Sequence, residues 1–329
     1  MKLYRLKLRP LSAWRTPWQA DTIAGLLCWA CARTLGGETL REEILGPCLQ
    51  GEPPFVVSDA FPHDFLPVPE ALRLLEWRDH DRKAIKRAQW LKPEVFGKAQ
   101  GGAEPSSAAF LADRFFRRYG QPHNTLDRLT DTTHATAGSL YALDEVGLNH
   151  REINRELYGA QTGRLDDPQY LSVYVRVAGG FEGRVRQLFG ALAQTGFGAD
   201  ISAGKGYFEV ISDLEDAGWL DNVAAPPNGV ILLSTFQPGE SDPTEGYWQT
   251  FTKFGKVGPD FGLANVFKRP LVMLRPGACF RSTANRPFLG RAIPIEQLLP
   301  SANADALRAA GAAVTHLAFG LAVPAALNF

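Results

Sequence analysis

Residues 171–210 read "LSVYVRVAGGFEGRVRQLFGALAQTGFGADISAGKGYFEV", and the spacing of the apolar residues changes twice along this stretch. At its start, apolar residues alternate at 171, 173, 175 and 177, which predicts a strand. Apolar residues at 185, 188, 189 and 192 then follow the i, i+3, i+4, i+7 spacing of a helix. A glycine-rich loop, 196–206, follows the helix and leads into a predicted strand, "YFEVIS" (207–212).

The residues before this stretch add three more elements. Residues 3–9 alternate with period two and predict a strand, and 20–34 predict a buried helix with Asp21 or Thr22 as N-cap and Gly36-Gly37 as stop. Residues 134–148 predict a second strand. The resulting order is β-α-β-β-α-β, interrupted by an irregular block at 38–135. This order is typical of an α+β, ferredoxin-like (RRM-like) domain, with two helices on one face of an antiparallel sheet.

The C-terminal part contains three further apolar runs, "VILLSTF" (230–236), "PLVMLRP" (270–276) and "HLAFGLAVP" (316–324), which predict strands. Little of this part has helical spacing, so a doubly wound sheet is excluded. We therefore predict two domains. Residues 1–213 form a ferredoxin-like domain with the inserted block 38–135, and residues 214–329 form a second, degraded ferredoxin-like domain.

The composition is that of a folded protein: 45% of the 329 residues are hydrophobic, 21% are charged, and the net charge is zero. A zero net charge argues against a free-standing nucleic-acid binder with a basic surface. No apolar run approaches the roughly 18 residues that a membrane-spanning helix needs. Four cysteines form no disulfide framework in a chain of this length, so we expect a cytoplasmic protein.

The glycine-rich loop matches neither common nucleotide motif. In a P-loop a Ser or Thr follows the lysine, but Gly206 follows Lys205 here, and Ala199 stands where the motif begins with glycine. The dinucleotide pattern fails at Ile201. Both motifs also run from a strand into a helix, whereas this loop leaves a helix and enters a strand. A nucleotide site is therefore excluded.

Two interpretations of the loop stay open. Its backbone N–H groups can form a concavity for the phosphates of an RNA, with a hydroxyl and an ammonium group beside it. The residues of that site would be Gly196, Gly198, Ser202, Gly204, Lys205 and Gly206. Alternatively, the glycines form only a helix C-cap and a bulge at the strand entrance.

Two other stretches carry groups that bind RNA. "HNTLDR" offers His123, Asn124, Thr125 and Arg128 to phosphates and base edges; the alternative is a turn in which Arg128 pairs with a neighbouring aspartate. "GYWQTFTKFGK" (246–256) interleaves aromatic residues with Lys253 and Lys256, a combination that stacks single-stranded bases. The same pattern also fits a hairpin that packs on its own core.

A third segment, 78–98, is basic, and it is either a solvated helix face or an inserted contact segment.

No pattern in the sequence indicates catalysis. Cys28 and Cys31 form a CxxC without a second pair, and they lie inside the predicted first helix, where core packing is expected. The six histidines have no metal-ligand spacing, and no serine stands in a nucleophile motif. We predict a non-enzymatic protein without cofactor or metal.

A glycine-rich loop after the second helix of a ferredoxin-like domain resembles the RAMP superfamily of CRISPR-associated proteins. Further stretches in the same order resemble the fourth Csm subunit of type III-A CRISPR effector complexes, over nearly the whole chain. They are "DTIAGLLCWA" (21–30), "SDAFPHDFLPVP" (58–69), "HNTLDRLTDTTH" (123–134), "TFTKFGKVG" (250–258) and "KRPLVMLRPGACF" (268–280).

This resemblance implies an RNA-binding structural subunit in antiviral defence. Such a subunit holds the 5′ repeat-derived tag of the crRNA, docks the large polymerase-like Cas subunit and contacts the backbone Csm subunit, without cutting RNA. The chain departs from the family pattern at Ala24 and at Asp131, whose carboxylate would repel a phosphate. The alternative is a RAMP-type, metal-independent endoribonuclease that processes the crRNA precursor. Its base would be His123 or His134, with Lys205 stabilising the charge.

Overall fold

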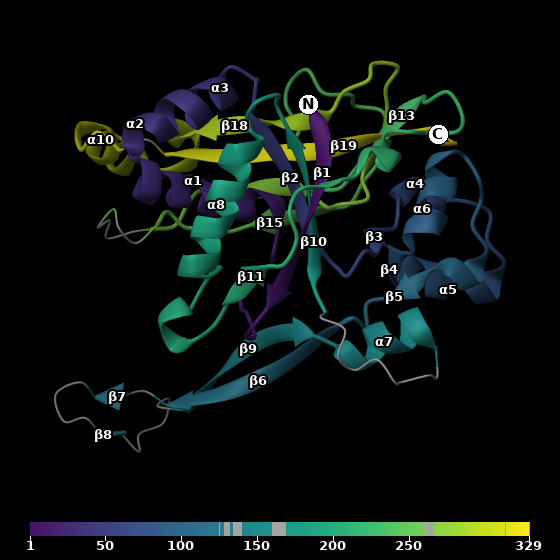
Figure 1. The fold of residues 1–329 in the computed structure, drawn as a ribbon, viewed down its shortest axis with the longest axis horizontal. Coiled ribbons are helices and arrows are strands. Elements are labelled where there is room, and N and C mark those ends of the chain that lie inside the picture. The colour runs from purple at the N-terminus through teal and green to yellow at the C-terminus, as the bar shows by residue number, and fades with distance from the viewer. Residues whose placement is uncertain are drawn as a thin grey trace.

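The computed structural model describes residues 1–124, 126–127, 132–133, 140–159, 169–258, 261, 266–312 and 314–328. These residues form two five-stranded sheets, smaller two- and three-stranded sheets, and a long hairpin that projects from the rest of the chain (Figure 1). In this part of the chain no helix has the length and apolar character needed to cross a membrane.

The first sheet has the strand order β11-β1-β10-β2, and all its neighbouring strands are antiparallel. Helices α1 and α8 connect its strands, and a short strand, β12, extends its pairing with β1. The elements are β1 (Lys2–Pro10), α1 (Ala20–Leu35), β2 (Phe55–Pro62), β10 (Leu171–Val177), α8 (Glu182–Thr195), β11 (Phe208–Val210) and β12 (Glu215–Asp216). Their order along the chain is the predicted β-α-β-β-α-β.

The predicted position of the second strand of this sheet is wrong. The structure has β2 as the second strand, inside the block 38–135 that we expected to be an insertion. The described part of the 134–148 segment, residues 140–148, pairs with residues 116–124 instead. The insertion instead separates β2 from β10. Every residue of β2 is buried, and its two polar residues, Ser58 and Asp59, are adjacent, so the strand lacks the apolar–polar alternation that predicts a strand.

Short helical segments fill the chain between α1 and β2. They are α2 (Gly37–Thr39), the π-helical turn η1 (Leu40–Leu45) and α3 (Gly46–Leu49).

The block between β2 and β10 contains short helices, a small sheet and the long hairpin β6–β9, with β7 paired to β8 beyond its end (Figure 1). Its helical segments are α4 (Glu70–Arg73), α5 (Asp79–Arg87), α6 (Pro93–Gln100), η2 (Ser107–Ala109) and α7 (His150–Tyr158). Its strands are β3 (Leu66–Pro67), β4 (Ala88–Leu91), β5 (Leu111–Ala112), β6 (Phe116–Asn124), β7 (Leu126–Asp127), β8 (Thr132–Thr133) and β9 (Leu140–Leu148).

The second sheet has the order β14-β17-β13-β19-β18, and β15 pairs with β16 beside it. Its strands are β13 (Gly229–Leu232), β14 (Gly246–Tyr247), β15 (Thr250–Lys253), β16 (Leu271–Leu274), β17 (Cys279–Arg281), β18 (Phe288–Pro294) and β19 (Thr315–Ala325). The helical segments of this half are η4 (Gly218–Leu220), α9 (Ile295–Leu298) and α10 (Ser301–Ala309).

The second sheet does not repeat the order of the first. In the first sheet β10 and β11, which flank α8, are separated by β1 and run parallel. In the second sheet β18 and β19, which flank α9 and α10, are antiparallel neighbours. The predicted second ferredoxin-like copy is therefore wrong in its strand order. The three predicted strands do form, but apolar runs do not specify which strands become neighbours.

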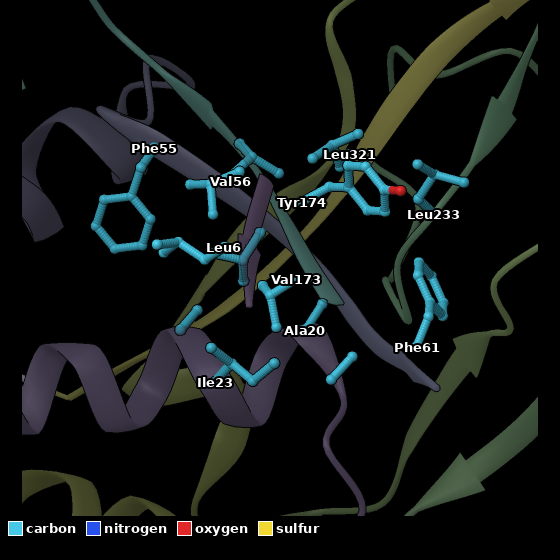
Figure 2. Packing of buried hydrophobic residues seen from close by; sticks show 14 of the residues in the cluster. Leu6, Ala20, Ile23, Phe55, Val56, Phe61, Val173, Tyr174, Leu233 and Leu321 are labelled. Atoms are coloured by element: carbon cyan, nitrogen blue, oxygen red, sulfur yellow. The ribbon is translucent and has the colours of Figure 1, made fainter. Parts of the chain in front are cut away.

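One hydrophobic cluster joins the two sheets. It contains Leu6 and Ile23 from the first half and Leu233 and Leu321 from the second, and Figure 2 shows these side chains around the strands of the first sheet. Tyr174 of β10, which is fully buried, lies among the residues from the second half. Because the halves share a core, neither sheet exposes its apolar face to water.

Asp59 of β2 joins the two halves by hydrogen bonds. Its Oδ1 accepts from the backbone N–H of Ala20 at 2.8 Å and of Thr235 at 2.6 Å, and its Oδ2 accepts from the Thr235 hydroxyl at 2.8 Å. The carboxylate thus satisfies an N–H group in the first turn of α1, a role that an N-cap side chain usually fills. The predicted N-cap at Asp21 or Thr22 is wrong, since the helix begins at Ala20 and its N-cap residue, Gln19, makes no side-chain cap bond.

Burial raises the pKa of Asp59 to about 6, although the hydrogen bonds from Thr235 and Ala20 act in the opposite direction. The pKa of an unfolded aspartate is about 3.9. Between these values the folded protein binds more protons than the unfolded chain, so this group makes the free energy of unfolding fall as the pH rises from about 4 to about 6.

We predict that Asp59→Asn preserves the fold and removes this pH-dependent loss, because the amide oxygen still accepts two bonds and the Thr235 hydroxyl can accept from the amide. Asp59→Ala leaves three buried donors without an acceptor and should lower the free energy of unfolding by about 2–3 kcal/mol across the pH range. Urea unfolding between pH 4 and pH 7 measures both. An Asn variant that keeps the wild-type pH dependence would contradict the assignment.

Candidate nucleic-acid interface

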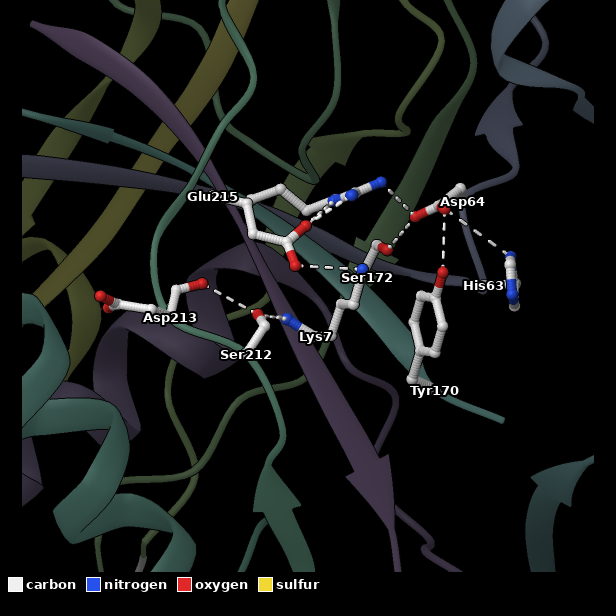
Figure 3. Close-up of polar contacts among 9 residues, drawn as sticks. Lys7, His63, Asp64, Tyr170, Ser172, Ser212, Asp213 and Glu215 are labelled. Atoms are coloured by element: carbon white, nitrogen blue, oxygen red, sulfur yellow. Dashed lines mark hydrogen bonds and ion pairs between the residues drawn. The ribbon is translucent and has the colours of Figure 1, made fainter. Parts of the chain in front are cut away.

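The face of the first sheet opposite α1 and α8 is where an RRM domain binds RNA. In this chain the face carries Arg5, Lys7 and Arg9 of β1, and each is ion-paired. Arg5 contacts Asp64 at 2.8 Å and also Glu215, and Lys7 contacts Glu215 at 3.0 Å (Figure 3). Arg9 contacts Glu209. These three cations are already neutralised within the chain.

Asp64 connects this network to β10. Its two oxygens accept from the Tyr170 hydroxyl at 2.9 Å and from the Ser172 hydroxyl at 2.8 Å (Figure 3). Burial, together with the charge of Asp64, raises the pKa of Tyr170 above its usual range. The ring of His63 packs on Tyr170 with 4.2 Å between centroids. The network is charge-balanced and half-buried, and RNA binding in the RRM manner would have to break it.

The glycine-rich loop follows α8 and contains the short 3-10 turn η3 (Ile201–Ala203). Close packing explains two of its glycines. A Cβ on Gly198 would lie 2.5 Å from the Cβ of Thr16, and a Cβ on Gly206 would lie 2.0 Å from the carbonyl oxygen of Phe197. Gly196 ends α8 with a φ of 87°. Gly204 also has a positive φ, but the space around it is open.

Most backbone N–H groups of the loop donate within the chain. Gly196 donates to Leu192 O at 2.9 Å, and Gly206 donates to Ala13 O at 2.8 Å. Gly204 and Lys205 donate to carbonyls inside the loop itself. These bonds fix the shape of the loop, so its conformation does not depend on a bound anion. Contact with an RNA backbone at the loop stays a prediction.

The ammonium group of Lys205 is fully engaged by the hairpin. Its Nζ lies 2.7 Å from Oε1 and 2.9 Å from Oε2 of Glu145 on β9, and it donates to Gln121 Oε1 on β6 at 2.7 Å. The Glu145 side chain is only 1% exposed. Beside it, Trp14 and Val146 exchange two backbone hydrogen bonds of 2.9 and 2.8 Å. Lys205 therefore fastens the base of the hairpin to the glycine-rich loop.

The other predicted residues of this region are spread along the hairpin and the loop. His123 and Asn124 lie on β6, where the His123 ring stacks on Tyr141 with 5.7 Å between centroids. Ser202 is exposed in η3. Thr125 and Arg128 lie outside the described residues.

Lys253 and Lys256 lie apart from the loop, at β15. Lys253 Nζ donates to Gln19, Asp21 and Thr22 at 2.7–2.9 Å, so it binds the N-terminal turn of α1. Lys256 lies over the ring of Phe267, 5.1 Å from its centroid. The predicted site residues thus form two groups, one at the glycine-rich loop and one at the start of α1.

A buried polar chain continues from Lys253. Asp21 Oδ2 lies 3.2 Å from Nε2 of His316, whose Nδ1 lies 3.3 Å from Nζ of Lys268. Burial opposes ionisation of Asp21, but the hydrogen bond from His316 and the charge of Lys253 lower its pKa to about 2. Burial lowers the pKa of Lys268 to about 8. This chain of contacts ties α1 to the second sheet.

A cleft of about 490 Å³ lies between the two groups. It is formed where the 14–19 segment, β2, the inserted block, the base of the hairpin and the second half meet. We call it the junction cleft. Gln19 and Glu145 both line it, so each group of predicted residues borders it. The aromatic residues of its wall are Trp14, Trp18, Phe61, Trp90 and Phe116.

Four arginines line the junction cleft, and they differ in their partners. Arg15 pairs with Asp200 of the glycine-rich loop, and Arg73 pairs with Glu70 at 3.0 Å. Arg118 and Arg275 have no carboxylate within ion-pair distance in the described part of the chain. Arg275 instead lies over the ring of Phe251, 4.7 Å from its centroid. These two guanidinium groups are available for a phosphate.

We did not predict the residues of the junction cleft as a site. Arg118 stands in "RFFRRYG" (114–120), whose basic and aromatic residues were the available signal. Arg275 follows the strand β16, and Trp14 and Trp18 lie in the loop before α1, with no local pattern to mark them.

Other chemistry is not evident among the described residues. No group of three or more His, Cys, Asp or Glu residues there is placed to hold a metal ion. Cys31 is in the core and Cys28 packs against it, as predicted. Burial raises the pKa of both thiols.

Comparisons with known proteins identify the fold. No family model matches the sequence, and no curated protein matches it. Among solved structures, a chain of a Csm1–Csm4 cassette in complex with pppApA is 17% identical with a TM-score of 0.59, and the match covers 100% of this chain and 99% of that one. A chain of a Csm3–Csm4 subcomplex in the type III-A CRISPR-Cas interference complex is 12% identical with a TM-score of 0.60, covering 98% and 99%.

Over nearly its whole length, this chain therefore has the fold of a subunit in both assemblies. Csm4 is the component that the two assemblies have in common. The resemblance seen in the sequence is confirmed by these structural neighbours, which are consistent with a Csm4-like subunit.

We predict that Lys205→Ala destabilises the protein by about 3 kcal/mol, because it leaves the buried Glu145 carboxylate without its cation. The double variant Lys205→Met/Glu145→Gln removes both charges and should recover much of this loss. Urea unfolding of the wild type and of the single and double variants measures the coupling. If Lys205→Ala were as stable as the wild type, the proposed fastening of the hairpin would be wrong.

Proposed function

We propose that this chain is a Csm4-like structural subunit of a type III-A CRISPR interference complex that holds the 5′ tag of the crRNA. The single-stranded tag would lie in the junction cleft, with bases stacked on its aromatic side chains and phosphates on Arg118 and Arg275. In this proposal the first half is a ferredoxin-like RAMP unit, and the protein acts in the cytoplasm as a binder without catalytic activity.

The junction cleft is the observation that carries this proposal. Binding of single-stranded nucleic acid combines aromatic stacking surfaces with cations that contact the backbone. The cleft offers both, since the partly exposed rings of Trp90 and Phe116 line it and two of its arginines lack a carboxylate partner among the described residues. The alternative surface, the open sheet face, has Arg5, Lys7 and Arg9 neutralised.

The partners in this proposal follow from the neighbouring structures. Those chains were solved in assemblies with Csm1 and with Csm3. By analogy, we propose that this chain docks a large Cas subunit and a backbone Csm subunit. The nucleotides in the Csm1–Csm4 cassettes are ligands of those assemblies, and we assign none to this chain.

A nuclease is less well supported than a binder. The endoribonuclease alternative requires Lys205 to stabilise negative charge on a reacting phosphate. Its ammonium group already contacts Glu145 and Gln121. Incubation of the protein with repeat RNA in EDTA tests this point: specific cleavage that His123→Ala abolishes would favour the nuclease over the binder.

We predict that Arg118→Ala/Arg275→Ala lowers retention of crRNA in the co-expressed complex by about tenfold or more, since each lost charge-assisted contact to a phosphate is worth about 1.5–3 kcal/mol. Quantitative sequencing of the copurified RNA, normalised to subunit content, measures the retention.

The matched control is Arg186→Ala/Arg308→Ala, which removes two exposed arginines from α8 and α10 that pair with Asp213 and with Glu296. The control should retain crRNA at the wild-type level. Equal retention by the two double variants would refute the role of the junction cleft.

A further inference from the structure

Helix α5 presents a concentrated basic surface in a chain whose net charge is zero. Between residues 78 and 98 there are seven basic and three acidic residues. Lys83, Lys86 and Arg87 are exposed and have no carboxylate partner among the described side chains. Together with Arg82, which is also exposed, they repeat at i, i+1, i+4 and i+5, so they occupy one face of the helix. We call these four residues the α5 basic face.

The structure fixes the orientation of this face. Ile85, on the opposite side of α5, is 1% exposed and anchors the helix. The guanidinium of Arg73 donates to the carbonyls of Ile85 at 2.8 Å and Lys86 at 3.2 Å, and to Ala88 O at 2.7 Å. Arg73 is itself paired with Glu70. These contacts fix the position of α5, so its four cations point away from Ile85.

The α5 basic face is connected to the junction cleft through β4 and Arg73. Strand β4 begins at Ala88, directly after the helix, and its residues Gln89 and Trp90 line the cleft. Arg73, which holds the C-terminal end of α5, lines it as well. Figure 1 places α5 at the outer side of the inserted block, beside β4. A strand of nucleic acid that leaves the cleft along β4 would meet the cations of α5.

We propose that the α5 basic face binds the phosphate backbone of the RNA strand outside the junction cleft, without reading its sequence. This inference rests on the proposed function, because it extends the path of an RNA that this chain is proposed to hold. The chemistry of the α5 basic face suits a polyanion, because lysine ammonium groups act as point charges for phosphates. The bases would lie in the junction cleft, so these side chains contact only the backbone and read no sequence. The face extends the binding path and strengthens it at low salt.

Salt dependence tests this proposal. The triple variant Lys83→Gln/Lys86→Gln/Arg87→Gln of the full chain is titrated against a fluorescent, mixed-sequence single-stranded RNA between 50 and 300 mM KCl. Each phosphate contact to a single strand contributes about 0.7 to the slope of log K against log salt. We expect the slope to fall by about two, with the same loss for RNAs of different sequence.

The matched control removes three exposed arginines elsewhere, Arg41→Gln/Arg186→Gln/Arg308→Gln, and so changes the net charge equally. It should keep the wild-type slope. A triple α5 variant that binds RNA with the same slope as this control overturns the proposal. Wild-type binding that does not depend on salt overturns it as well.

Two further outcomes separate this inference from the proposed function. In the first outcome, the slope of log K against log salt falls in the α5 variant while Arg118→Ala/Arg275→Ala binds RNA normally. The α5 basic face then binds RNA as proposed, and the assignment of RNA to the junction cleft is wrong. If the α5 variant keeps its RNA slope but no longer copurifies with a partner subunit, the face binds an acidic protein surface and our proposal is wrong.

Discussion

Strand β2 has no solvated side, and the arrangement of the rest of the chain depends on that constraint. All eight of its residues are buried, because β2 packs against both α1 and strand β19 of the second half. At its centre the Asp59 carboxylate accepts from donors of both halves, the start of α1 and Thr235. The two halves are therefore one packed body around a shared core. The loops that meet at their seam have fixed positions relative to one another, and these loops form the junction cleft.

The same constraint explains what the sequence could and could not predict. β1, α1 and α8 were predictable because one face of each packs on the core, which leaves a periodic pattern. β10 is buried on both faces, yet Ser172, Tyr174 and Arg176 alternate with its apolar residues, so it was predictable as well. β2 was missed because it has no such alternation: its polar residues, Ser58 and Asp59, are adjacent. The strand order of the second sheet was missed because pairing is decided by contacts far apart in sequence.

The candidate site shows the same limit. The glycine-rich loop was predictable from its composition, but the partner of Lys205 is sixty residues away in sequence, on a hairpin whose docking no local pattern reveals. We expected Lys205 to contact a phosphate, but in the structure it forms an ion pair that attaches the hairpin to the glycine-rich loop. Arg118 stood in a basic, aromatic stretch, yet only the fold shows that it shares a cleft with Arg275. The sequence shows which residue types could bind RNA. It does not show which residues, distant in sequence, the fold brings together in one site.

The most direct test of the central claim, that RNA lies in the junction cleft, is ultraviolet crosslinking of the RNA-loaded complex followed by mass spectrometry of the crosslinked peptides. Aromatic side chains that stack on bases crosslink efficiently, and the cleft and the open sheet face each carry such residues. Our account predicts crosslinks in the peptides that contain Trp90 and Phe116, the partly exposed aromatic residues of the cleft. Crosslinks confined to Tyr170, which lies beside Lys7 and Asp64 on the first sheet, with none from the cleft, would contradict it.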